Sequence, residues 1–242
     1  MNRRRFIAGL VAASTSAGAF AQTAPATPAP LIYYAGQAGR LTSDRDAQGG
    51  NPFASALVEV IAERPLTIAT FTRRMAEANA IHSRGWQQLD YPRRLPEPKL
   101  RLDAKGGTRL ALVLINSDYS QSDAYSLPGA AVDAKRVPEA LKKAGFETTL
   151  VYNQTAGQAR EALQDFAARS EEADAAVIYI GGHGAQDGRT VYWLMGDYPG
   201  QDAKWLTTHA IAVDEIARAG HAKALNVVLY ASCRDNPFAP PQ

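Results

Sequence analysis

Short aliphatic runs alternate with amphipathic segments from residue 108 to the end of the chain. Continuous apolar runs are typical of strands buried on both faces. Such runs occupy residues 109–115, 175–180 and 225–230, and residues 146–152 predict a further strand. Between them, apolar residues at helical spacing predict two helices, one with Ala134, Val137, Leu141 and Ala144 inward and one with Ala159, Leu163, Phe166 and Ser170 inward. Strands that alternate with helices predict a parallel sheet covered on both faces.

Smaller signals refine this second part of the chain. Gly145 is expected to end the first helix in the left-handed conformation. Pro138 fits only a first turn, so that helix is expected to begin late or to kink there. Residues 189–195 predict a small hairpin arm, and residues 213–219 predict a short helix.

The front of the chain carries a strand and two helices of its own. Residues 31–35 form an apolar strand, and Asn51-Pro52-Phe53 provides an N-cap followed by proline at the first helical position. Thr67 is expected to cap a second helix. The predicted inward residues are Phe53, Leu57, Val60 and Ile61 in the first helix and Ile68, Phe71, Met75 and Ala78 in the second.

The first 30 residues resemble a targeting segment. Arg3, Arg4 and Arg5 precede an uncharged Ala-rich stretch, and Ala19-Phe20-Ala21 fits a cleavage site after Ala21, as in a twin-arginine signal peptide. Residues 22–30 then form a Pro/Ala linker. We therefore expect an exported protein, periplasmic or secreted, with no stable membrane anchor after cleavage; an uncleaved anchor is the alternative.

Composition excludes several classes. An apolar content of 46% with 21% charged residues is ordinary for a globular protein. Removing the three leading arginines from 26 basic residues leaves 23 against 24 acidic residues, so no basic surplus predicts nucleic-acid binding. Cys233 is the single cysteine, which excludes an intrachain disulfide and a multi-thiolate zinc site.

Two chemically capable residues follow predicted strands. His183 lies in Gly181-Gly182-His183-Gly184, and Cys233 follows the strand 225–230. Functional groups gather beyond the carboxyl ends of parallel strands, so this pair predicts a nucleophile and its base. Taken singly, a lone Cys is more often an inert small apolar residue, and a His among glycines is often only a turn residue.

These motifs resemble bacterial caspase-like peptidases of the caspase/metacaspase group. The resemblance spans residues 108–238 and rests on Ile115-Asn116-Ser117-Asp118-Tyr119, Asp133-Ala134, Tyr179-Ile180-Gly181-Gly182-His183-Gly184 and, above all, Cys233-Arg234-Asp235-Asn236-Pro237-Phe238. It implies a three-layer α/β/α fold with a mostly parallel sheet of about six strands. It also implies a cysteine endopeptidase with His183 as base and acid, Cys233 as nucleophile, the N–H groups of Gly184 and Cys233 as oxyanion hole, and a thioester intermediate. Its partner would be a peptide or protein substrate.

The front segment resembles the part of this family that normally follows the Cys strand. Residues 31–35, the acidic loop Ser43-Asp44-Arg45-Asp46, the helix at Asn51-Pro52-Phe53 and the tail Ser83-Arg84-Gly85-Trp86 appear in that order. We therefore predict a circular permutation: residues 31–90 are the family's C-terminal half, residues 91–107 are a linker, and residues 108–242 are the N-terminal half with the dyad. Two separate domains are the alternative, although about 60 residues can barely support a core.

Substrate choice is less determined by the sequence. The predicted substrate-binding residues are Asp44, Asp46, Asn116 and Ala231. Relatives that cleave after Arg or Lys carry an acid where Ala231 stands, whereas Asp44 and Asp46 would attract basic substrates. A solvated loop or a charge at a helix N-terminus explains these acids equally well.

Two function classes therefore stay open, an exported endopeptidase and an inactive caspase-like module that binds a peptide or protein. No cofactor or metal is expected. The sequence does not support calcium activation, as in some metacaspases, and it leaves the oligomeric state open.

Overall fold

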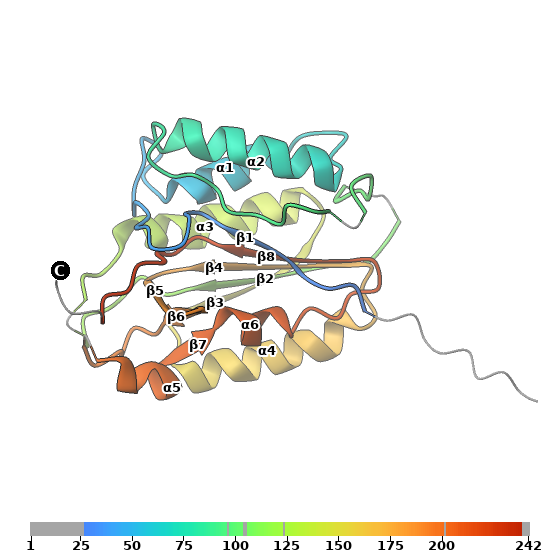
Figure 1. Ribbon diagram of the computed structural model, residues 1–242. Coiled ribbons are helices and arrows are strands. Elements are labelled where there is room, and N and C mark those ends of the chain that lie inside the picture. Colours follow the sequence, from blue (N-terminus) through green and yellow to red (C-terminus); the bar gives the residue numbers. More distant parts are fainter. Residues whose placement is uncertain (1–26, 96, 104–105, 123, 201, 239–242) are drawn as a thin grey trace, which may run out of the picture.

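A five-stranded parallel sheet forms the centre of the protein. The computed structural model describes residues 27–238 except 96, 104–105, 123 and 201. Helices cover both faces of this sheet, with α1, α2 and α3 on one side and α4 and α6 on the other (Figure 1). The predicted three-layer α/β/α architecture is confirmed, although the sheet has five strands and not six. Its strands, in spatial order, are β1 (Leu31–Tyr34), β8 (Leu225–Tyr230), β4 (Ala175–Gly181), β2 (Arg109–Ile115) and β3 (Glu147–Tyr152).

Alternate residues of the central strands enter two separate cores. In β2, Val113 packs toward the α1–α3 side and Leu112 toward the α4–α6 side. Both residues are at most 1% exposed, which explains why the strand sequences are apolar at nearly every position. The helices of the first face are α1 (Pro52–Val60), α2 (Ile68–His82) and α3 (Pro128–Lys143); those of the second are α4 (Ala156–Ser170) and α6 (Val213–Ala217).

The front of the chain completes the same sheet. Strand β1 pairs in parallel with β8, with Leu31 beside Val227 and Tyr34 beside Tyr230. The Tyr33 side chain is fully buried, and its hydroxyl group hydrogen-bonds the Thr72 hydroxyl group at 2.7 Å. Residues 31–90 and 108–231 therefore share one core and one sheet.

Local signals account for most helix boundaries. The Asn51 side chain accepts from the N–H of Phe53 and the Thr67 side chain from the N–H of Thr70, as their sequence positions predict. Gly145 adopts a φ of +91° directly after the predicted helix. All of the inward residues predicted for the four helices are buried.

The helix with Pro138 does not begin late, which was one of the two outcomes expected for it. Helix α3 begins ten residues earlier, with Pro128 in its first turn, and continues through Pro138 to Lys143. Proline cannot donate a backbone hydrogen bond, and Pro138 lies inside α3 on its buried face.

A second, three-stranded antiparallel sheet lies beside the end of β4. It consists of β5 (Gly184–Asp187), β6 (Thr190–Leu194) and β7 (Ala210–Ala212). The short helix α5 (Leu206–His209) lies directly before β7 in the chain. The predicted arm at residues 189–195 is thus β6 of this sheet. Strand β5 begins immediately after His183.

The expected signal peptide, residues 1–21, lies outside the described residues, as does most of the 22–30 linker. No helix within the described part of the chain is long and apolar enough to cross a membrane.

Candidate active site

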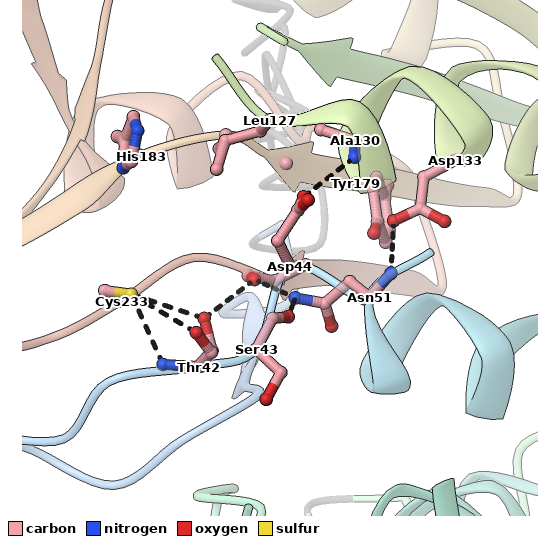
Figure 2. A pocket seen from close by; sticks show the side chains of 13 residues that line it. Thr42, Ser43, Asp44, Asn51, Leu127, Ala130, Asp133, Tyr179, His183 and Cys233 are labelled. Atoms are coloured by element: carbon pink, nitrogen blue, oxygen red, sulfur yellow. Dashed lines mark hydrogen bonds between the residues drawn. The ribbon is translucent and has the colours of Figure 1, made fainter. Parts of the chain in front are cut away.

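His183 and Cys233 follow the carboxyl ends of neighbouring strands. Strands β4 and β8 pair Ile180 with Tyr230, and His183 and Cys233 each lie three residues beyond that pair. Both side chains line one cavity of about 100 Å³ (Figure 2). The parallel register therefore brings together the two residues that the sequence singled out.

Glycine is required where the two loops meet. A Cβ atom on Gly184 would lie 1.8 Å from the Tyr230 hydroxyl oxygen and 2.6 Å from the Cys233 carbonyl oxygen. No side chain fits at these distances, so the backbone after His183 packs directly against the backbone of Cys233. Gly184 and Cys233, the predicted oxyanion residues, are therefore neighbours.

Tyr119 and Tyr125 hold His183 in place. The Tyr119 hydroxyl oxygen accepts the backbone N–H of His183 at 2.8 Å, and the Tyr119 ring meets the imidazole edge-on at 4.4 Å between centroids. The Nε2 atom lies 2.7 Å from the Tyr125 carbonyl oxygen. A carbonyl only accepts, so Nε2 carries the hydrogen and Nδ1 has the free lone pair of the neutral ring. Burial lowers the pKa of His183, which favours this neutral form.

The Cys233 sulfur is held by the front segment of the chain. Its hydrogen-bond partners within residues 27–238 all belong to Thr42, whose N–H donates to Sγ at 3.3 Å and whose hydroxyl group lies 3.5 Å from it (Figure 2). Burial raises the pKa of the Cys233 thiol, and the two Thr42 contacts act in the opposite direction. The free protein therefore holds a neutral thiol at neutral pH.

The residue after the cysteine ties the site to the front segment. Arg234 is 8% exposed, and its Nη1 atom lies 2.6 Å from Asp90 Oδ2. Its guanidinium group also stacks over the Tyr34 ring at 4.0 Å. These contacts fix the chain directly after Cys233 against the strand β1.

Two carboxylates line the same cavity as His183 and Cys233. Asp44 accepts from the N–H groups of Gly129 at 2.9 Å and Ala130 at 3.1 Å, at the start of α3. The helix N-terminus thus orients Asp44, as the alternative reading of this acid expected. Asp133 accepts from Arg136 Nε at 2.8 Å and from the Asn51 N–H at 3.0 Å. Burial nevertheless raises the pKa of Asp133 to about 6.

A buried phenol completes the cavity wall. Tyr179 is fully buried, and its hydroxyl group has no hydrogen-bond partner among the residues that the structure describes. It lines the same cavity as Asp44 and Asp133. Buried polar groups are almost always paired, so this hydroxyl group is suited to meet a bound molecule.

Two of the predicted substrate-binding residues lie elsewhere. The Asp46 carboxylate accepts the Gln48 N–H at 2.8 Å and its side chain is 1% exposed beside His82, outside the residues that line the cavity. Asn116 is fully buried and accepts the Gln154 N–H at 2.9 Å, which joins the ends of β2 and β3. Their amide and carboxylate groups serve local structure. Asp44 and Ala231, in contrast, do line the cavity.

Sequence reasoning missed the contributions of Thr42, Tyr119, Tyr125 and Tyr179. Tyr125 acts through its backbone carbonyl group and Thr42 in part through its backbone N–H, and residue type gives no signal for backbone contacts. Tyr179 lies within the string that carried the resemblance, yet a strand residue reveals neither the direction of its hydroxyl group nor its lack of a partner.

Comparison with known families agrees with this geometry. The caspase domain profile matches residues 108–241, which is more than half of the chain and includes both His183 and Cys233. The chain therefore belongs to the caspase domain family of cysteine peptidases, and a peptide or protein is its class of substrate. A search of curated proteins found no match to this chain.

The residues present do not point to a metal site. No group of three or more His, Cys, Asp or Glu side chains suited to a metal ion occurs within the described residues.

Proposed function

We propose that this protein is an endopeptidase that cleaves peptide bonds with a Cys233–His183 dyad, after a basic residue, and that it acts after export. The supporting observation is the shared cavity, in which a sulfur and an imidazole from adjacent strand ends face one acidic wall. Asp46 and Asn116 have no part in this proposal.

The reaction starts from a neutral pair. His183 Nδ1 accepts the thiol proton as Cys233 attacks the scissile carbonyl carbon, while Tyr125 keeps Nε2 protonated. The Thr42 N–H stabilises the negative charge that develops on sulfur. The N–H groups of Gly184 and Cys233 are assigned to the oxyanion. His183 then protonates the leaving amine, and a water molecule that it deprotonates hydrolyses the thioester.

Asp44 supports the basic preference. Two N–H groups orient its carboxylate, and Nε of the exposed Arg45 side chain lies 3.5 Å from Oδ2. A carboxylate has about four acceptor positions, so a lone pair remains for a guanidinium or ammonium group. Asp133 adds less charge because Arg136 pairs with it.

Peptides that differ only at the residue before the bond test the mechanism. We expect the parent to cleave the Arg peptide, and Cys233→Ala and His183→Ala to lower kcat by about 10³-fold or more while the fold is kept. His209→Ala, which changes a histidine outside the cavity, is the matched control. Turnover that survives Cys233→Ala, or no turnover by the parent on any peptide, would instead support the inactive binding module.

Specificity has its own test. Asp44→Asn should lower the ratio of kcat/KM for Arg over citrulline by roughly ten- to a hundredfold, the value of a charge-assisted hydrogen bond. Asp46→Asn alters a nearby acid outside the cavity and should leave that ratio unchanged. Equal effects of the two substitutions would contradict the role of Asp44.

The permutation is supported by the parallel pairing of β1 with β8 and by the Arg234–Asp90 contact. A rearranged gene tests it, with residues 108–238 placed before residues 31–107, which keeps the buried Leu102. The new connection must return along β8, so a flexible linker of about 15 residues is needed. We expect a folded protein with parental specificity; an insoluble product that neither folds nor cleaves would argue against the rearrangement.

Export is tested by cell fractionation. The parent should appear outside the cytoplasm and begin after Ala21, whereas replacing Arg4 and Arg5 by lysine should retain it inside. An unprocessed parent that pellets with membranes would indicate the uncleaved anchor.

A further inference from the structure

A second cavity of about 240 Å³ borders the same two residues from the other side. It shares only His183 and Cys233 with the acidic cavity. The sulfur and the imidazole therefore form the boundary between two cavities. Gly184 lines the second cavity only.

The chemistry of the second cavity is different. Its walls include Leu41, Leu194, Tyr198, Pro237 and Phe238. The rings of Tyr198 and Phe238 lie 6.2 Å apart, and the Tyr198 hydroxyl group donates to the Asp202 carbonyl oxygen at 2.8 Å. The phenol is thus already paired, and the ring offers an apolar face.

One acid lines this cavity. This acid is Asp235, and the other side chains that line the cavity are mostly apolar or aromatic. An aliphatic or aromatic side chain suits the space better than a charged one. A cavity of 150 Å³ lined by apolar side chains already holds benzene, so 240 Å³ is enough for a leucine or phenylalanine side chain.

A peptide bond at the sulfur divides the substrate between the two cavities. This inference rests on the proposed function, in which the residue before the bond enters the acidic cavity. The residue after the bond then lies on the side of Gly184, next to the imidazole that protonates the leaving amine. We propose that the second cavity binds a large apolar side chain of the residue that follows the cleaved bond, so that the substrate class is a basic–apolar junction.

Partition of the thioester between water and added amines tests this cavity directly. An acyl-arginine methyl ester loads Cys233, and leucinamide, phenylalaninamide or glycinamide then competes with water. The amine nitrogen attacks the thioester carbonyl carbon, a C–N bond forms and the C–S bond breaks with its electron pair left on sulfur. His183 accepts the proton that the amine loses and returns it to the sulfur.

We expect leucinamide and phenylalaninamide to capture the acyl group roughly ten- to a hundredfold more efficiently than glycinamide, since hydrophobic contacts discriminate by such factors. Phe238→Ala should reduce this preference severalfold and leave the Arg-over-citrulline ratio unchanged. Phe238→Lys should shift the preference toward aspartamide. Ile81→Ala, which removes an apolar side chain that is 71% exposed on α2, is the matched control.

The outcomes separate the two proposals. Equal capture of all amines by a parent that hydrolyses the ester would overturn this inference and leave the proposed function standing. A preference for apolar residues two positions before the bond, with no selection among amines, would place the cavity on the acyl side and also overturn it. A parent that never hydrolyses the ester would refute both proposals.

Discussion

Replacing Tyr179 by phenylalanine should raise stability and lower activity together. The substitution deletes one oxygen atom that is fully buried and has no partner among the described residues. An unsatisfied buried polar group costs about 1–3 kcal/mol. We take the lower end, about 1 kcal/mol, because the hydroxyl group is neutral and charged groups cost more. For a protein of this size that gain corresponds to a rise in Tm of about 2–4 °C.

The same oxygen is expected to contact substrate in the acidic cavity. Losing one neutral hydrogen bond of about 0.5–1.5 kcal/mol should reduce kcat/KM for an Arg peptide by roughly two- to tenfold. Thermal unfolding of the peptide-free protein and steady-state kinetics of the same samples give the two readouts.

Tyr33→Phe is the matched control. Tyr33 is also fully buried in the same core, but its hydroxyl group is paired with Thr72 at 2.7 Å and lies away from the cavity. Its removal should lower stability by about 1 kcal/mol and leave kcat/KM unchanged. If Tyr179→Phe destabilises the protein as much as Tyr33→Phe does, the Tyr179 hydroxyl group is paired in solution and the reasoning is wrong.

Three further predictions concern the same site. Burial lowers the pKa of His183, so kcat/KM should stay high below the ordinary imidazole value of about 6.5 and fall only at more acidic pH; an acid limb at or above 6.5 in the pH profile would contradict this. Because the pKa of Asp133 is about 6, the Arg-over-citrulline ratio should rise between pH 5 and pH 7 as this carboxyl group ionises, and Asp133→Asn should flatten that rise. Gly184→Ala should abolish turnover because its Cβ would collide with the Cys233 carbonyl oxygen, whereas Gly157→Ala, whose Cβ has no heavy atom nearer than 3.9 Å, should gain about 0.5–1 kcal/mol in unfolding experiments.

The central strands could be predicted from the sequence because a strand that is buried on both faces is apolar at nearly every position. Strand β8 occupies the predicted residues 225–230 without a shift, and every residue of it is buried. The start of helix α3 was harder to predict, because proline is expected in the first turn of a helix and Pro138 lies in the interior of this one.

The part of the candidate site that lies directly after the strands could be predicted from the sequence. His183 and Cys233 follow paired residues of adjacent parallel strands, so their approach is a consequence of topology. Asp46 and Asn116 were misplaced because a sequence does not show which way a side chain points. The sulfur contact of Thr42 joins residues 191 positions apart, a separation at which local patterns carry no information.

The placement of Thr42 also explains why the front segment matters for the chemistry. The matched caspase domain, residues 108–241, contains Cys233 and His183 but neither Thr42, which contacts the sulfur, nor Asp44. Both of these lie in the loop that follows β1, and β1 is held beside β8 by strand pairing and by the Arg234–Asp90 ion pair. Weakening that ion pair by Asp90→Asn should therefore lower kcat/KM, because the loop that carries Thr42 and Asp44 would be held less firmly beside Cys233. The proposed dyad would thus depend on residues from both parts of the chain.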